Sequence, residues 1–177
     1  MLRRLLFIIV PVAVVGAAEA PKMKTIKYRG GVITFRVPAS WKEEYEPEGG
    51  GTFYDSAPDA GVLRLNVIAA KAPKGKLPLD GYHHLASEPL AKGERLSKTE
   101  NGDGIKFKRE AKEDEGHKLA FYSWEVVHCA PPDKLYVAVF TWTILAAQDG
   151  NQKAKKELEL IDAEVSKAHF HPDLGKL

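Results

Sequence analysis

Residues 117–147 decide the fold, and their sequence is HKLAFYSWEVVHCAPPDKLYVAVFTWTILAA. Apolar and aromatic side chains alternate on both sides of the turn Ala130-Pro131-Pro132-Asp133, which predicts two strands, 117–129 and 134–147. Because the turn is short, the two strands should pair antiparallel. Both faces of 134–147 are apolar, so we expect this strand to lie centrally in a sheet.

Two more strands precede this hairpin, at 94–100 and 104–113, and short glycine-containing turns separate them from each other and from the hairpin. A helix is predicted from about Asn151 to Lys167. Its apolar residues recur at spacings of three and four, which places them in one stripe on a charged helix: Ala154, Leu158, Ile161, Val165 and Ala168. This stripe should pack on a face of the sheet.

The amino-terminal half alternates short strands with turns. Period-two patterns predict strands at 24–28, 32–37, 52–55 and 62–70. Between the second and third of these strands, residues 39–44 are expected to form one helical turn around Trp41.

A further helix should begin after Asp80, which is a suitable N-cap residue. We expect this helix to end near Leu90 or Ala91, or a turn earlier because Pro89 falls inside that span. At the other end of the chain, the tail from about His169 is expected to be loosely held.

One segment carries a resemblance to a known family. Residues 33–41, Ile-Thr-Phe-Arg-Val-Pro-Ala-Ser-Trp, form a strand that ends in proline and is followed by a small pair and a tryptophan. A glycine-rich turn and the short aromatic strand Gly51-Thr52-Phe53-Tyr54 come next. Together with the order of the elements, this resembles the PsbP-like superfamily, which includes Mog-type Ran-binding proteins and exported bacterial proteins of the DcrB kind.

The resemblance implies an α+β fold in which an antiparallel β-sheet is flanked by helices in an α/β/α sandwich. It implies little about activity, because members include photosystem accessory subunits, a partner of a small GTPase and secretion chaperones. No catalytic residue is carried over to this chain, since a fold does not determine a function.

Residues 1–20 are predicted to be a secretory signal. Arg3 and Arg4 precede an uncharged run of eleven residues, 5–15, which is too short for a membrane-spanning helix but suits a signal core. Cleavage is expected after Ala18, with cleavage after Ala20 as the alternative, and an uncleaved anchor is a further alternative. The chain is therefore expected to be exported to the periplasm, envelope or exterior, with 21–177 as a single globular domain.

Charge argues against nucleic-acid binding. The chain has 26 basic and 24 acidic residues, and loss of Arg3 and Arg4 with the leader leaves the two signs almost equal. A broad basic surface is therefore not expected. The single cysteine, Cys129, is expected to be a buried, inert thiol, with an intermolecular disulfide as the alternative.

The histidines are the candidates for metal binding. His169 and His171 flank Phe170, so on an extended segment both rings point to one side, and Asp173 is near enough to join them. A metal site needs three or four ligands in fixed geometry, so a solvated tail is the competing interpretation. The adjacent pair His83 and His84 points in different directions on a helix and is not expected to share one ion.

No motif predicts catalysis. The chain has no G-x-S-x-G nucleophile elbow, no phosphate-binding loop after Gly49-Gly50-Gly51 and no calcium loop around Glu113. Cys129 and His128 are neighbours on a strand and should point to opposite faces. We expect no cofactor and no enzymatic activity.

Aromatic side chains form the candidate interaction surface. They fall on two neighbouring strands and share a face on each: Tyr122, Trp124, Tyr136, Phe140 and Trp142. If no helix covers these faces, they should make an apolar binding surface. The interpretation that we favour is that they form the core beneath a helix.

These observations favour an exported, non-catalytic accessory or protein-binding module. Its partner is expected to be another envelope or secreted protein, with no nucleic acid and with membrane contact only through an uncleaved leader. The alternatives are a small-ligand or metal-binding exported protein, which would use the carboxy-terminal histidines, and an enzyme with a site assembled from scattered residues.

Overall fold

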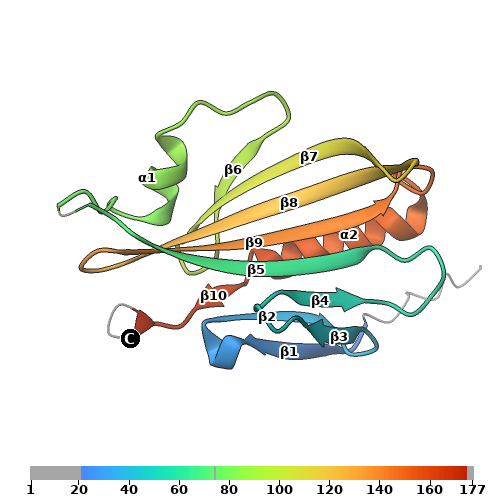
Figure 1. Ribbon diagram of the computed structural model, residues 1–177, viewed down its shortest axis with the longest axis horizontal. Helices are drawn as coiled ribbons and strands as arrows, with labels where there is room; N and C mark the ends of the chain where they lie inside the picture. Colours follow the sequence, from blue (N-terminus) through green and yellow to red (C-terminus); the bar gives the residue numbers. More distant parts are fainter. Residues whose placement is uncertain (1–20, 74, 175–177) are drawn as a thin grey trace, which may run out of the picture.

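The main element of the fold is a seven-stranded antiparallel sheet with the order β3-β4-β5-β9-β8-β7-β6 (Figure 1). The computed structural model describes residues 21–73 and 75–174. The strands of this sheet are β3 (Lys42–Tyr45), β4 (Gly51–Tyr54), β5 (Val62–Lys71), β6 (Arg95–Lys98), β7 (Gly104–Asp114), β8 (His117–Ala130) and β9 (Lys134–Leu145). The predicted hairpin of 117–147 is confirmed as β8 and β9, with β9 in the centre of the sheet as expected.

A second, three-stranded sheet has the order β1-β2-β10 and was not predicted. Its strands are β1 (Met23–Tyr28), β2 (Ile33–Pro38) and β10 (His169–Phe170). A single 3-10 turn, η1 (Arg29–Gly31), joins β1 to β2. The sheet therefore combines the two ends of the described chain.

The prediction of a loose tail is wrong for residues 169–174. β10 pairs with Ile33 and Thr34 of β2, and the side chains of Phe170 and Leu174 are only 5% and 2% exposed. The hydroxyl of Tyr136 donates to the carbonyl of Leu174 at 3.2 Å. The tail is fixed in place because the side chains of Phe170 and Leu174 are buried in the core, which removes their apolar surface from water.

Two helices are present in the described residues; the first begins at the predicted cap and the second begins next to the predicted start, Asn151. The carboxylate of Asp80 accepts from the backbone N–H of His83 at 2.8 Å and starts α1 (Gly81–Ala86). The side chain of Asn151 accepts from the N–H of Ala154 at 2.7 Å and starts α2 (Gln152–Val165). α1 takes the shorter of the two predicted lengths and ends ahead of Pro89.

The helical turn predicted for 39–44 is wrong, because the chain becomes extended again at β3. The buried side chain of Trp41 closes a tight turn in which its N–H donates to the carbonyl of Pro38 at 3.0 Å. The next four residues then pair with β4. Pairing with an available strand outweighs the weak helical preference of a short charged segment.

The core lies between the large sheet and a layer formed by α2 and the small sheet. The rings of Phe35 on β2 and Phe140 on β9 meet edge to face with centroids 5.1 Å apart. Four of the five residues in the predicted helical stripe are buried against this face, and Leu158 is partly buried. Figure 1 shows α2 running along the long strands and the small sheet lying beside it.

The opposite face of the large sheet is covered only at one end, by α1. Here two glycines allow a very close approach, because a Cβ on Gly81 would lie 1.7 Å from the carbonyl oxygen of Val127 and a Cβ on Gly104 would lie 2.5 Å from the backbone of Gly81. The predicted α+β class with an antiparallel sheet flanked by helices is confirmed. The second flanking helix is so short that much of its face of the sheet is left open.

Candidate binding surface

The predicted aromatic surface is wrong as an interaction site, because its members form the core. Tyr122, Trp124, Tyr136, Phe140 and Trp142 are all less than 9% exposed. α2 and the small sheet cover them. The indole N–H of Trp124 donates to Asp162 of α2 at 2.7 Å, while the rings of Phe140 and Tyr136 contact Phe35 of β2 and Phe170 of β10. The interpretation favoured from the sequence, that these residues form the core, is the correct one.

The carboxy-terminal histidines do not gather around one point. His169 is exposed on β10, while the nitrogen Nδ1 of His171 accepts from the backbone N–H of Asp173 at 3.2 Å. Across residues 21–73 and 75–174, no three side chains of His, Cys, Asp or Glu lie close enough to hold a metal ion. The structure therefore does not assemble a three-ligand site from these residues.

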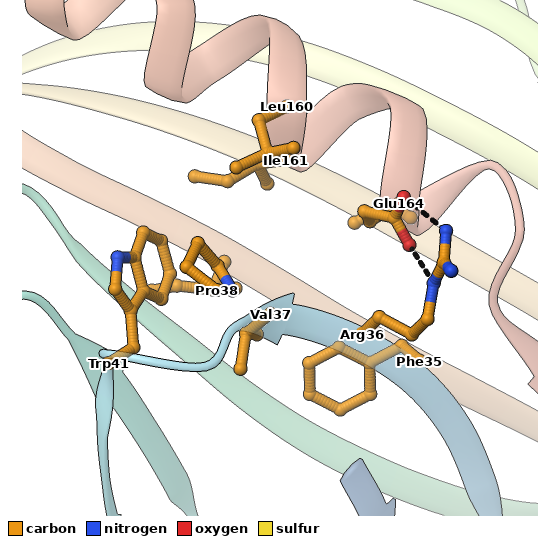
Figure 2. A pocket seen from close by; sticks show the side chains of 10 residues that line it. Phe35, Arg36, Val37, Pro38, Trp41, Leu160, Ile161 and Glu164 are labelled. Carbon is orange, nitrogen blue, oxygen red and sulfur yellow. Dashed lines mark hydrogen bonds and ion pairs between the residues drawn. The ribbon is translucent and has the colours of Figure 1, made fainter. Parts of the chain in front are cut away.

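Several charged side chains serve to join elements of the core. Figure 2 shows Arg36 of β2 reaching Glu164 of α2 through two hydrogen bonds, each 2.8 Å long. Burial acts to raise the pKa of Glu164, but the hydrogen bonds and charges of Arg36 and Lys167 outweigh burial and hold this pKa below its ordinary value. The cavity beside this pair measures about 10 Å³, which is room for about one water molecule.

A second group of this kind lies at the start of α2. Asp149 accepts hydrogen bonds from the hydroxyl of Tyr122 and from the guanidinium of Arg109, and Arg109 also donates to the Tyr122 oxygen at 3.2 Å. Asp162 likewise pairs with Arg95 at 2.7 Å. These pairs are structural contacts that join the core side of the sheet to α2 and the turn before it.

The remaining surface of interest is the uncovered side of the large sheet, which we call the open face. The register of the strands places the alternate residues of β5, β9 and β8 on it in rows. In one row Ile68 and Val137 are neighbours, and Val139 follows in the next row. We call these three residues the central patch; Ile68 is 53% exposed and both valines are only partly buried.

A groove lies at the end of the open face that is remote from α1. It has a volume of about 310 Å³, at the lower end of the range of about 300–1,000 Å³ for ligand pockets. We call it the end groove, and it is lined by Ala60, Val62, Arg64, Asp114, Leu119, Phe121, Thr143, Ile144 and Leu145. Its floor is mostly apolar, and Leu145 is 41% exposed.

The end groove carries two charged side chains that have no partner in the part of the chain that the structure describes. Glu110 beside it pairs with Lys108 and Lys112 at 3.5 and 3.3 Å. In contrast, neither Arg64 nor Asp114 has a side-chain partner among the described residues. The groove thus offers one unpaired cation and one unpaired anion.

Neither the central patch nor the end groove was identified from the sequence. Period-two alternation separates the two faces of β9 correctly, with the aromatic residues on one and Leu135, Val137, Val139, Thr141 and Thr143 on the other. The alternation does not indicate which of the two faces of β9 a helix covers. The usable signal is that large aromatic side chains prefer the dry face, which leaves valine and threonine on the open one.

The comparisons with known proteins inform the fold. No family model matches the chain, and no curated protein matches it. A Bacteroides thetaiotaomicron VPI-5482 protein of known structure matches with a TM-score of 0.54 and 17% identity, over 85% of this chain and 49% of that one. The chain thus spans about half the length of that protein.

LpqN of Mycobacterium tuberculosis, a protein involved in cell envelope biogenesis, matches with a TM-score of 0.56 and 12% identity, over 85% of this chain and 91% of its own. The solution structure of the cyanobacterial PsbP of Synechocystis sp. PCC 6803 is also among the matches, with 14% identity over 92% of this chain and all of that one. Because its TM-score is 0.37, this match does not support the fold comparison, which rests on the other two proteins. At these identities the likeness concerns the fold alone.

The described helices are too short and too polar to cross a membrane. The predicted leader, residues 1–20, lies outside the described residues.

Proposed function

We propose that this protein is an exported, non-catalytic accessory module that binds another exported protein through the central patch of its open face. The observation that carries the proposal is a long antiparallel sheet with one dry face and one face that α1 covers only at one end. An antiparallel sheet can leave one face in water when that face is polar, but Ile68, Val137 and Val139 place apolar surface on this one. A partner protein would supply the missing cover.

The chemistry of the central patch suits such a partner. Protein interfaces combine an apolar centre with a polar rim. Ile68, Val137 and Val139 supply the centre, and the salt bridge between Lys106 and Glu125, 3.2 Å long, lies in the same row as Val139 and forms part of the rim. The nearly balanced charge of this rim favours a protein over a polyanion.

Export is supported by the sequence of residues 1–20. Two arginines, a short apolar core and small residues before Pro21 are the pattern of a secretory signal. The envelope role of LpqN, which has the same kind of fold, is in keeping with this location.

Site-specific crosslinking tests the proposal. A photoreactive phenylalanine analogue at Val139, in the full chain expressed in its native host, should give one defined adduct in the exported fraction. Ile68→Asp should abolish this adduct, because a charge at the centre of an apolar contact is costly to desolvate. The matched control is Tyr45→Asp, which changes a side chain of similar exposure, 54%, on the edge strand β3.

The control variant should retain the adduct. An adduct that survives Ile68→Asp in a folded protein would contradict the proposal, as would the absence of any adduct from Val139.

A further inference from the structure

The end groove has features of its own that the proposed function does not use. The register places Thr143 of β9 between Val62 of β5 and Phe121 of β8, and Leu145 lies beside Leu119 in the next row. These side chains make an apolar floor at the opposite end of the sheet from α1. The proposed function therefore does not explain which molecule covers the end groove.

The two unpaired charges restrict the chemistry of an occupant. Arg64 is exposed on β5, and Asp114 ends β7, so they belong to different strands that both line the groove. Lys112 is already engaged, since it pairs with Glu110 and lies 5.3 Å from the centre of the Phe121 ring. A simple anion would pair with Arg64 but would be repelled by Asp114, and a simple cation would pair with Asp114 but would be repelled by Arg64. An occupant that satisfies both residues must carry charges of both signs.

We propose that the end groove is a self-association surface, at which a second copy of this chain binds face to face about a two-fold axis. In a two-fold interface, residue i of one copy contacts residue j of the other and the reverse contact is also made. Arg64 of each copy then meets Asp114 of the partner copy. One groove with one charge of each sign is self-complementary, so both charges are satisfied at once.

The apolar floor supports the same arrangement. Two sheets that pack face to face bury the side chains of their facing rows, as in a β-sandwich. Leu145, 41% exposed in the single chain, is then covered together with Val62 and Phe121. The apolar contact supplies affinity, and the charge pairs determine which way round the copies bind.

Charge reversal with sedimentation velocity tests this inference on the full chain exported and processed with its own leader. The wild type should show a concentration-dependent dimer. Arg64→Asp and Asp114→Arg should each weaken the dimer at least about tenfold, since each places like charges together twice. Lys27→Asp, a reversal at an exposed position of β1, is the matched control and should leave the dimer unchanged.

The decisive measurement is the equimolar mixture of the two reversed variants. In a mixed dimer, the carboxylate introduced by Arg64→Asp in one copy faces the guanidinium introduced by Asp114→Arg in the other. The unchanged Arg64 and Asp114 face each other as well, so both pairs form again. The mixture should therefore dimerise although each variant alone does not, and this result also shows that both variants are folded.

A wild type that stays monomeric would assign the groove to another occupant and overturn the inference. A dimer that both reversals leave intact would overturn it as well. The inference is independent of the proposed function, because the crosslinking experiment uses the central patch and can fail or succeed separately.

Discussion

At the scale of single residues, Gly61 is unusually constrained. A Cβ at this position would lie 2.0 Å from Nε1 of Trp142, which is the buried side-chain nitrogen that has no hydrogen-bond partner among the described residues. The backbone N–H of Gly61 also donates to Glu157, whose pKa is raised mainly by burial. The glycine therefore closes the chain directly over the indole.

Gly61→Ala should destabilise the protein by about 1–3 kcal/mol, because the added methyl group forces Trp142 or the chain out of place. Urea unfolding followed by tryptophan fluorescence would measure this loss. Ser56→Ala, an exposed change in the same loop, is the control and should stay within about 0.5 kcal/mol of the wild type. Equal stability of Gly61→Ala and the control would contradict the close packing.

Cys129 should be a poor nucleophile. Burial, with help from the charges of Asp80 and Asp103, raises the pKa of its thiol from the ordinary 9.0 to about 11. Since only the thiolate reacts, alkylation by iodoacetamide at pH 8 should be about 100-fold slower in the folded protein than in urea. Mass spectrometry of timed samples would measure this ratio, and similar rates in both states would disprove the prediction.

At the scale of elements, the start of α1 depends on pH. The backbone N–H and the ring of His83 both hydrogen bond to Asp80 and lower the pKa of its carboxyl from 3.8 to about 2. A carboxyl with a lowered pKa stabilises the fold above its ordinary pKa, and this contribution is lost as the pH falls through about 2. Carbon chemical shifts of residues 81–86 should therefore report fraying of α1 between these two values.

Asp80→Asn is the matched control for this titration. Asparagine caps a helix about as well as aspartate but does not titrate, so the variant should not show the acid-induced change of the wild type. Identical titrations of the two proteins would show that Asp80 is not responsible.

The carboxy-terminal strand should contribute strongly to stability. The ring of Phe170 stacks on His128 with centroids 5.3 Å apart, and His128 in turn bonds to Asp103 at 2.7 Å. Phe170→Ala should cost about 3 kcal/mol or more, as for other buried phenylalanines. Thermal or urea unfolding would measure it.

The double change His169→Ala with His171→Ala is the control, because both rings are exposed. Its stability should stay close to that of the wild type. If zinc, copper or calcium stabilised the wild type but not this double variant, the metal-binding alternative would regain support.

The elements that the sequence predicts correctly are those whose pattern is long. The strands of 104–147 and the stripe of α2 repeat their pattern several times, so the periodicity identifies them without any tertiary information. β3 and β10 have four and two residues and exist because a partner strand is available, which local patterns do not encode. The open face was missed for a similar reason, since covering a face is a property of the assembled layers.

At the scale of the whole molecule, charge is nearly balanced if residues 1–20 are removed as predicted. Loss of residues 1–20 takes Arg3 and Arg4 from 26 basic residues, leaving 24, and takes Glu19 from 24 acidic residues, leaving 23. The processed protein should pass through a heparin column at about 150 mM salt without retention, because retention requires many uncompensated basic contacts. Elution only at high salt would reveal a basic surface that this balance does not predict.

The contact between Gly81 and Gly104 has a practical consequence for protein engineering. It fixes the start of α1 to the sheet by a backbone-to-backbone approach, while the loop beyond α1 lies away from the sheet (Figure 1). An epitope tag inserted around Lys92 and Gly93, in the exposed loop beyond α1, should thus be displayed away from the sheet and leave the strand pairing undisturbed. The same loop offers a place to attach a fluorophore or an affinity handle while both candidate surfaces stay unmodified.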